Sequence, residues 1–188
     1  GLNEKKQFLV WQDMPLFWHS AMVFARIPTV HGIVFVFPPD SLDRNREMIR
    51  ELMREHGPEF DWRTAPGGAK RQDSVFSGLQ ALPPECDQVL VHDAARPFIT
   101  ADLVQRVLSG LDAGAAGVVP GLPVTDTIKQ QGQTGLITLD RSRLIAVQTP
   151  QGFQRHVLEA AHQSGQDKGW DVTDDASMVE RLGQEVAS

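Results

Sequence analysis

Strand and helix signals alternate along most of this chain, and this alternation limits its fold more than any other feature. The apolar run Gly32–Phe37 is typical of a buried strand and ends at two prolines, and residues 41–56 have the spacing of an amphipathic helix. The same order returns with an apolar run at 89–91 and a helix that Thr100 can cap. Such alternation builds a mostly parallel sheet covered by helices. We therefore expect a doubly wound α/β fold.

Size and composition favour one globular domain over residues 1–188. The chain has 188 residues, of which 41% are hydrophobic, enough for one sizeable core. The net charge of −6 argues against general nucleic-acid binding, which depends on basic surfaces. Cys86 is the single cysteine, so an internal disulfide is excluded and a reducing, cytoplasmic location is expected. No apolar run approaches membrane-spanning length, and we expect no membrane partner.

The alternation fails between residues 124 and 148, where short β-prone runs flank a Gly-Gln-Thr-Gly turn. This pattern predicts a β-hairpin arm that projects from the domain. An isolated two-stranded hairpin seldom buries enough surface to be stable. We therefore expect the arm to pack on a second copy of the chain, in a homodimer.

A glycine pair leads into a predicted helix at residues 67–75, which read G-G-A-K-R-Q-D-S-V. Glycine lets the backbone approach a ligand closely, and free N–H groups at a helix start favour anionic or carbonyl groups. A tight strand-to-helix turn with solvated charges explains these residues equally well. The spacing matches neither a P-loop nor a dinucleotide fingerprint, so the motif alone predicts only a candidate ligand loop.

Asp93 and Arg96 directly follow a buried strand, in the segment V-H-D-A-A-R-P at residues 91–97. In an open α/β sheet, ligands bind in the crevice beyond the carboxyl ends of the strands. There Asp93 can hold a hard cation and Arg96 a phosphate, although a lone aspartate more often caps a turn. We expect His92 to be packed or hydrogen-bonded and not catalytic, because no serine or cysteine nucleophile is paired with it.

Further charged residues lie beside the predicted arm and near the start of the chain. Thr127, Lys129 and Arg141 flank the arm and can together bind a phosphate, for which the planar fork of arginine is well suited. A solvated strand edge with alternating charge is the simpler explanation. Lys6 precedes an apolar run, where an exposed lysine is usually just solvated.

Seven short motifs occur in one order from Lys6 to Ser177 and together resemble a single family. They are K-Q-F-L, G-G-x-x-R-x-x-S-V, V-H-D-A-A-R-P, P-V-T-D-T-I-K, L-D-R-S-R-L, Q-T-P-Q and T-D-D-A-S. The family is 2-C-methyl-D-erythritol 4-phosphate cytidylyltransferase, of non-mevalonate isoprenoid biosynthesis. The resemblance implies a Rossmann-like nucleotidyltransferase sheet, the substrates CTP and methylerythritol phosphate, release of pyrophosphate, a divalent cation such as Mg²⁺ on the triphosphate, and a homodimer.

The resemblance also implies roles for individual residues. On the nucleotide side, Lys6 matches a catalytic lysine that steadies the triphosphate and the transition state, and Asp93 matches the acid at the metal and nucleotide. Positions that line the cytosine and ribose pocket match Gly68, Ala69, Ser74 and Ala94. On the acceptor side, Thr149 falls in the crevice. The family residues that bind the acceptor phosphate match Arg96, Thr127 and the catalytic Arg141, and in the family they reach it from the partner subunit.

Two parts of the family pattern are missing from these 188 residues. Family members begin with a strand and a glycine-rich loop of A-A-G-x-G-x-R type, and they end with an N-x-K-I-T-type strand. We expect the physical protein to carry both ends, because neighbouring strands would otherwise have unpaired edges. Three alternatives stay open: a ribitol-5-phosphate cytidylyltransferase, a non-catalytic nucleotide-binding remnant, and a second enzyme that follows Ser188 on the same chain.

Overall fold

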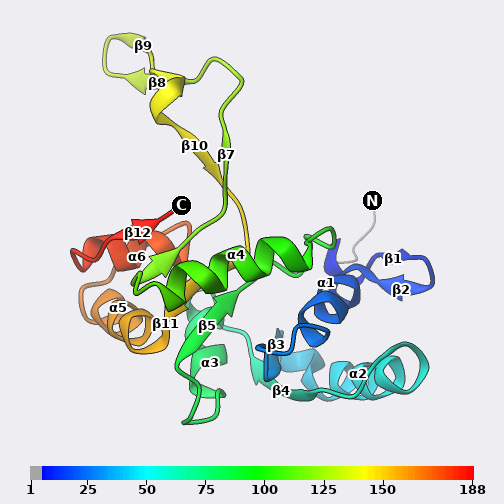
Figure 1. Ribbon diagram of the computed structural model, residues 1–188. Helices are drawn as coiled ribbons and strands as arrows, with labels where there is room; N and C mark the ends of the chain where they lie inside the picture. The colour runs from blue at the N-terminus through cyan, green and yellow to red at the C-terminus, as the bar shows by residue number, and fades with distance from the viewer. Residues whose placement is uncertain (1–5) are drawn as a thin grey trace.

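The computed structural model describes residues 6–188 and has the expected α/β arrangement (Figure 1). A four-stranded sheet has the order β12-β6-β11-β5, with β12 parallel to β6 and β11 antiparallel to both of its neighbours. Three of its strands therefore run in one direction and only β11 opposes them. The strands are β5 (Gln88–Val91), β6 (Gly117–Val118), β11 (Gln151–Gln154) and β12 (Val186–Ala187).

A second, two-stranded sheet pairs β3 (Gly32–Phe37) with β4 (Asp61–Pro66) in parallel. Within residues 6–188 the strands thus form two main-body sheets, where the sequence predicts one doubly wound sheet. The physical reason is that β3 and β5 do not hydrogen-bond to each other, so each has one unpaired edge among the described residues.

In the described part of the chain six helices cover these sheets, and the strand β11 shows how they divide between the two faces. Gly152 faces Val107 and Leu111 of α4, whereas the next residue, Phe153, is buried against α3, α5 and α6. Successive strand residues point to opposite faces, so the four-stranded sheet has helices on both sides. The helices are α1 (Leu16–Ala25), α2 (Leu42–His56), α3 (Arg71–Gln80), α4 (Ala101–Asp112), α5 (Arg155–Asp167) and α6 (Asp175–Arg181).

Local sequence signals explain where several of these elements begin and what they bury. Thr100 caps α4, because its Oγ1 accepts the backbone N–H of Leu103 at 3.2 Å. Ile49 and Leu52, on one face of α2, are buried with α1 and β3 in a core cluster. The predicted strand Gly32–Phe37 is confirmed at both of its ends. No helix among residues 6–188 is long and apolar enough to cross a membrane.

Close packing between α4 and β11 gives a first prediction, on stability. A Cβ atom at Gly152 would lie 2.5 Å from Cγ1 of Val107 and 3.0 Å from Cδ1 of Leu111. We expect Gly152→Ala to lower the free energy of unfolding by about 1–3 kcal/mol, because the core must shift to admit the methyl group. Denaturant unfolding measures this change. Gly165→Ala is the control, since its nearest contact would be an ordinary 3.4 Å from Met178; equal stability of the two variants would contradict the prediction.

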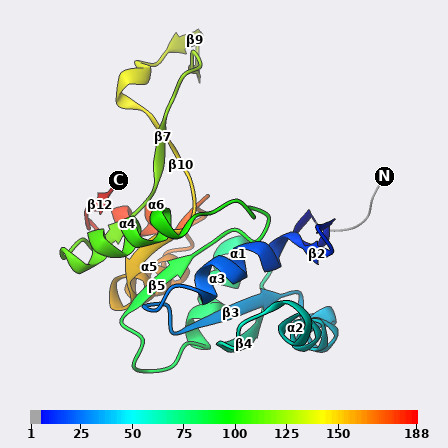
Figure 2. The same ribbon diagram turned by 45° about the vertical axis from the view of Figure 1, so that its right-hand side comes forward.

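The segment for which the sequence predicts an arm extends away from the main body in both views (Figures 1 and 2). Its stem is the antiparallel pair β7 (Gly121–Pro123) and β10 (Ile145–Val147), so it begins at Gly121 and not at residue 124. Its tip is the hairpin of β8 (Lys129–Gly132) and β9 (Gly135–Thr138). The remaining short elements are η1 (Lys6–Phe8), β1 (Val10–Trp11), β2 (Met14–Pro15), η2 (Pro39–Ser41) and η3 (Arg141–Arg143).

Candidate active site

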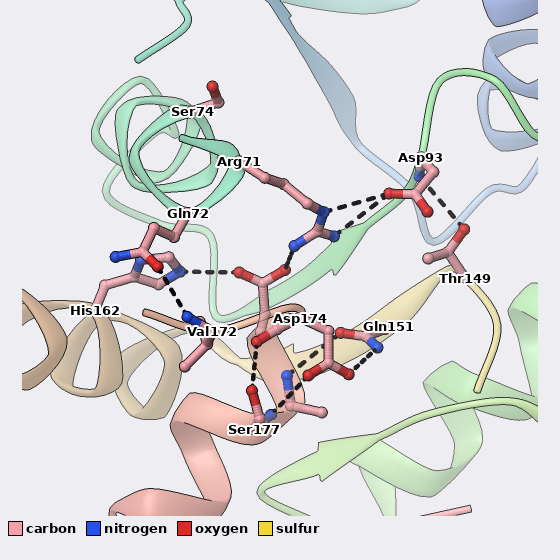
Figure 3. A network of polar contacts seen from close by, with 12 residues as sticks. Arg71, Gln72, Ser74, Asp93, Thr149, Gln151, His162, Val172, Asp174 and Ser177 are labelled. Atoms are coloured by element: carbon pink, nitrogen blue, oxygen red, sulfur yellow. Dashed lines mark hydrogen bonds and ion pairs between the residues drawn. The ribbon is translucent and has the colours of Figure 1, made fainter. Parts of the chain in front are cut away.

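Asp93 lies just beyond the carboxyl end of β5, between two arginine side chains. Nε and Nη2 of Arg71, the first residue of α3, donate to its Oδ1 at 3.4 Å each. Nε of Arg96 donates to its Oδ2 at 3.2 Å. Figure 3 shows Arg71 reaching from α3 toward Asp93. The sequence prediction that Asp93 emerges at a strand end is confirmed, and the structure adds Arg71 as its neighbour.

Arg71 is also bound on its far side by a buried carboxylate. Its Nη1 donates to Oδ2 of Asp175 at 2.6 Å, and Nε2 of His162 lies 3.1 Å from the other oxygen, Oδ1. Asp175 is fully buried. Burial alone would raise the pKa of Asp175, but the hydrogen bond from His162 and the charge of Arg71 outweigh it and hold this pKa below its ordinary value. The site therefore contains a buried, ionised aspartate.

The lowered pKa of Asp175 predicts a specific loss of stability in acid. Because the folded pKa lies below the unfolded value of about 4, its stabilising contribution is present above pH 4 and is lost as pH falls through the folded pKa. We expect Asp175→Asn to lower the free energy of unfolding by about 2 kcal/mol at pH 7 and to weaken its dependence on pH below 4. Urea unfolding over about pH 2 to 7 measures both effects.

The matched control is Asp171→Asn, because Asp171 pairs with Lys70 at 3.2 Å but is largely exposed. This exchange should leave both stability and its acid dependence close to those of the unsubstituted protein. An Asp175→Asn variant that kept the full acid dependence would contradict the assignment.

His92 contacts Arg96 and Thr149 through its two ring nitrogens, and Thr149 in turn contacts Asp93. Its Nε2 lies 2.9 Å from the carbonyl oxygen of Arg96, which can only accept, so we assign the proton to Nε2. Nδ1 then accepts from the hydroxyl of Thr149 at 3.1 Å, and that hydroxyl oxygen accepts the N–H of Asp93 at 3.4 Å. Burial lowers the pKa of His92, which favours this neutral form. His92 is hydrogen-bonded, as the sequence predicts.

The glycine loop before α3 is held against the start of that helix. A Cβ atom at Gly68 would lie 2.3 Å from Cβ of Asp73, so only glycine fits there. The N–H of Gly68 donates to Oγ of Ser74 at 3.1 Å, and this hydroxyl in turn donates to the carbonyl oxygen of Lys70 at 3.1 Å. Gly68 and Ala69 are exposed. They therefore lie on the surface, in the loop two to three residues before Arg71, which contacts Asp93.

Lys6 is exposed in η1, and its neighbour Phe8 shows where this segment packs. The ring of Phe8 stacks on that of Phe37 with 6.1 Å between centroids. The carbonyl oxygen of Phe37 accepts the N–H of Gly67 at 2.7 Å. Phe8, two residues after Lys6, thus lies at the carboxyl end of β3, the same end at which the glycine loop begins.

The sequence-predicted residues divide into two groups in this chain. One group comprises Ala94, Arg96 and Thr149, which lie beside Asp93, together with Gly68, Ala69 and Ser74, which precede or open the helix whose Arg71 contacts Asp93. The other group, Thr127 and Arg141, lies on the projecting arm, where Arg141 donates to the carbonyl oxygen of Thr125. Both arm residues are exposed, and within one chain the structure does not bring them to Asp93.

The carboxylates at this site are suited to a cation that is already coordinated by a phosphate substrate. Among residues 6–188 no three His, Cys, Asp or Glu side chains form a metal-binding cluster. Asp175 is fully buried beneath Arg71 and His162, whereas Asp93 is partly exposed, so of these two carboxylates Asp93 is the one that a ligand can reach. Mg²⁺ commonly uses one or two carboxylates, together with substrate phosphates and water. The donor set fits an ion carried on a phosphate substrate.

Sequence reasoning does not identify Arg71, His162 and Asp175 as parts of this site. By its pattern Arg71 is one of two basic residues at a helix start, although it is the arginine of the motif G-G-x-x-R. Asp175 belongs to the late motif T-D-D-A-S, which contributes to the resemblance without a role. Arg71 and Asp175 are 104 positions apart in the sequence. Only the occurrence of both motifs in the order typical of the family could have indicated that the two residues share a site.

Comparisons with known proteins agree on one family. A family model described as "IspD: 2-C-methyl-D-erythritol 4-phosphate cytidylyltransferase" matches residues 1–188. The bifunctional enzyme IspD/IspF of Oleidesulfovibrio alaskensis is 55% identical over 182 residues, 96% of this chain and 45% of that protein. A 2-C-methyl-D-erythritol 4-phosphate cytidylyltransferase of Streptomyces avermitilis is 44% identical over 196 residues, 99% of this chain and 76% of that protein.

A solved structure gives the same result. The crystal structure of 2-C-methyl-D-erythritol 4-phosphate cytidylyltransferase from Thermus thermophilus matches with a TM-score of 0.76 at 32% identity, covering 97% of this chain and 81% of that chain. The chain spans about half the length of the bifunctional relatives it matches. On the family model and these relatives, the chain belongs to the 2-C-methyl-D-erythritol 4-phosphate cytidylyltransferase family.

Proposed function

We propose that this chain transfers a cytidylyl group from CTP to 2-C-methyl-D-erythritol 4-phosphate in isoprenoid precursor biosynthesis. An oxygen of the acceptor phosphate attacks the α-phosphorus of CTP, the bond to the β-phosphate breaks, and pyrophosphate leaves. The product is 4-diphosphocytidyl-2-C-methyl-D-erythritol. The observation that carries the proposal is the Asp93 carboxylate, held between Arg71 and Arg96 beside a glycine loop, in a chain of this family.

The reaction requires little covalent chemistry from the protein and much positioning of charge. Lys6 meets the negative charge that develops on the triphosphate. Asp93 binds the divalent cation, for which we propose Mg²⁺, together with the nucleotide. Backbone and hydroxyl groups of the glycine loop and the β5 end hold the base and ribose; these residues are Gly68, Ala69, Ser74 and Ala94. Mg²⁺, when bound, neutralises phosphate charge and orients the leaving group.

The acceptor phosphate binds through Arg96, Thr127 and Arg141, with Thr149 on its side of the crevice. Thr127 and Arg141 reach it from the arm of a second subunit, so the working unit is a homodimer. The support is that apolar side chains at the arm tip are exposed to solvent, as expected for a surface that a partner covers. Leu136 is 69% exposed and Ile137 is 57% exposed. Analytical ultracentrifugation of the protein tests the dimer, and a monomer at all concentrations would contradict it.

We also propose that the two main-body sheets belong to one Rossmann-like nucleotidyltransferase core. The support is a contact between the loops that follow one strand of each sheet. Arg71 begins the helix after β4, and it contacts Asp93, which follows β5. The single half-buried cysteine, Cys86, is consistent with a cytoplasmic location. Fluorescence microscopy of a tagged protein tests that location.

Arg141 gives a prediction on substrate selectivity. We expect Arg141→Lys to raise the KM for methylerythritol phosphate by about tenfold, because a single ammonium replaces a two-pronged guanidinium, and to leave the KM for CTP unchanged. Steady-state kinetics with each substrate varied in turn measures both values. Arg143→Lys, in the same exposed turn, is the control. An unchanged acceptor KM would remove Arg141 from phosphate binding.

Pyrophosphate release tests the proposed function directly. The full-length protein should release pyrophosphate from CTP only when methylerythritol phosphate and Mg²⁺ are both present. A faster rate with ribitol 5-phosphate than with methylerythritol phosphate would reassign the acceptor. Calorimetric binding of CTP without turnover in any mixture would instead indicate a nucleotide-binding protein and overturn the proposal.

A further inference from the structure

Arg71 has unequal contacts with the two carboxylates that it joins. Its bond to Asp175 is short, 2.6 Å, and involves Nη1. Its two bonds to Asp93 are long, 3.4 Å each, and involve Nε and Nη2. Charge-assisted hydrogen bonds normally lie between about 2.7 and 2.9 Å. Arg71 is therefore fixed mainly by Asp175 and presents its remaining N–H groups toward Asp93.

The anchor for Arg71 is itself held by several elements. Asp175 is fully buried at the start of α6, and its second oxygen contacts His162 of α5. The ring of His162 stacks on that of Phe76 in α3, with centroids 5.8 Å apart. Figure 3 shows the side chains of Arg71 and His162, with dashed lines that mark these contacts. Three helices therefore fix the position of one guanidinium group.

The preceding residue of the chain reinforces the same anchor. Asp174 caps α6 by accepting the N–H of Ser177 at 3.1 Å, and it accepts Nε2 of the buried Gln151 at 2.9 Å. Gln151 is the first residue of β11, which is hydrogen-bonded to β5 along its length. The start of α6 is thus tied to the sheet whose edge strand leads to Asp93.

We propose that Arg71 is a positioning residue that fixes the Asp93 carboxylate for binding of the metal-bound nucleotide; this inference rests on the proposed function. The long bonds hold the direction of the carboxylate and leave its remaining lone pairs to a ligand. Arg96, the other contact of Asp93, is exposed and also bonds to Gln148. When Arg96 turns to the acceptor phosphate, Arg71 remains as the group that keeps Asp93 in place.

Exchange of Arg71 for lysine separates geometry from charge. Lysine keeps a positive charge but cannot contact Asp175 and Asp93 from opposite sides of one planar group. We expect Arg71→Lys to weaken CTP binding in the presence of Mg²⁺ by about tenfold and to raise the Mg²⁺ concentration needed for half-maximal rate. Arg71→Met should weaken CTP binding further. Calorimetry with CTP and Mg²⁺, on the full-length protein, measures the affinity.

A structural role alone would give a different pattern of results. In that case Arg71→Lys would reduce thermal stability and both substrate affinities together, and this outcome would overturn the proposal. We expect instead that CTP affinity falls while the KM for the acceptor stays unchanged, with a fall in the thermal midpoint that reflects only the lost guanidinium contact to Asp175. Arg50→Lys is the matched control, because Arg50 also pairs with a carboxylate, Glu47 at 2.8 Å, but on the exposed surface of α2.

The test also distinguishes this inference from the proposed function. If the unsubstituted protein binds CTP and Arg71→Lys binds it equally well, the positioning role of Arg71 is wrong and the function stands. If the unsubstituted protein does not bind CTP with Mg²⁺, the proposed function is wrong, and the role of Arg71 in it is wrong as well.

Discussion

Replacing Lys6 by alanine should lower kcat by about 10²- to 10³-fold while the free energy of unfolding changes by less than about 0.5 kcal/mol. Lys6 is exposed in η1, so its removal leaves no cavity. We expect a large effect because, in the proposed transfer, negative charge develops on the triphosphate and a fixed cation would stabilise it in the transition state. Single-turnover kinetics, together with denaturant unfolding, measures the two quantities separately.

Lys168→Ala provides the comparison for Lys6→Ala. Lys168 is also an exposed lysine, and its ammonium lies over the ring of Trp170 at 5.3 Å from the centroid, next to the end of α5. Its removal should leave kcat unchanged. If Lys6→Ala retained the turnover of the Lys168→Ala variant, Lys6 would have no part in the mechanism.

The second large effect is expected at Asp93. We expect Asp93→Asn to lower kcat/KM for CTP by about 10²- to 10³-fold, because the amide cannot replace a carboxylate as a ligand of Mg²⁺ or as a partner for two arginines. Asp93 is half-buried at the end of β5, so the fold should tolerate an amide of the same shape. Initial rates over a range of Mg²⁺ concentrations measure the loss.

Asp87→Asn is the matched control for Asp93, because Asp87 precedes β5, at the opposite end of the same strand. It should retain the unsubstituted kcat/KM. Recovery of the Asp93→Asn rate by higher Mg²⁺ would locate the defect in metal binding. An undiminished rate at low Mg²⁺ would exclude Asp93 from both the metal and the nucleotide.

The parts of the fold that follow from local chemistry were predictable from the sequence. The apolar run Gly32–Phe37 is a strand because its side chains are buried by α1 and α2, and Thr100 caps a helix because its hydroxyl reaches a free N–H group. The strand Gln151–Gln154 was missed. It is central but begins with a buried glutamine that is hydrogen-bonded to Asp174, so it has no apolar periodicity to detect.

The candidate site was predictable where ligand chemistry and strand ends coincide, and not where distant segments meet. Asp93 and Arg96 were expected as neighbours beyond one strand, and they are hydrogen-bonded. The contact between Arg71 and Asp175 joins residues 104 positions apart. A charged residue at a helix start has the same sequence pattern whether it faces solvent or a buried partner, so only packing of α3 against α6 could reveal it.

The arm and the site share a short stretch of backbone. The stem strand β10 ends at Val147 and β11 begins at Gln151, so only residues 148–150 separate them. Gln148 contacts Arg96, and Thr149 contacts both His92 and the N–H of Asp93. A tilt of the stem would therefore be expected to move the residues around Asp93. In the proposed homodimer we expect subunit association and acceptor affinity to be coupled through this stretch, so that turnover per subunit falls on dilution before the subunits themselves unfold.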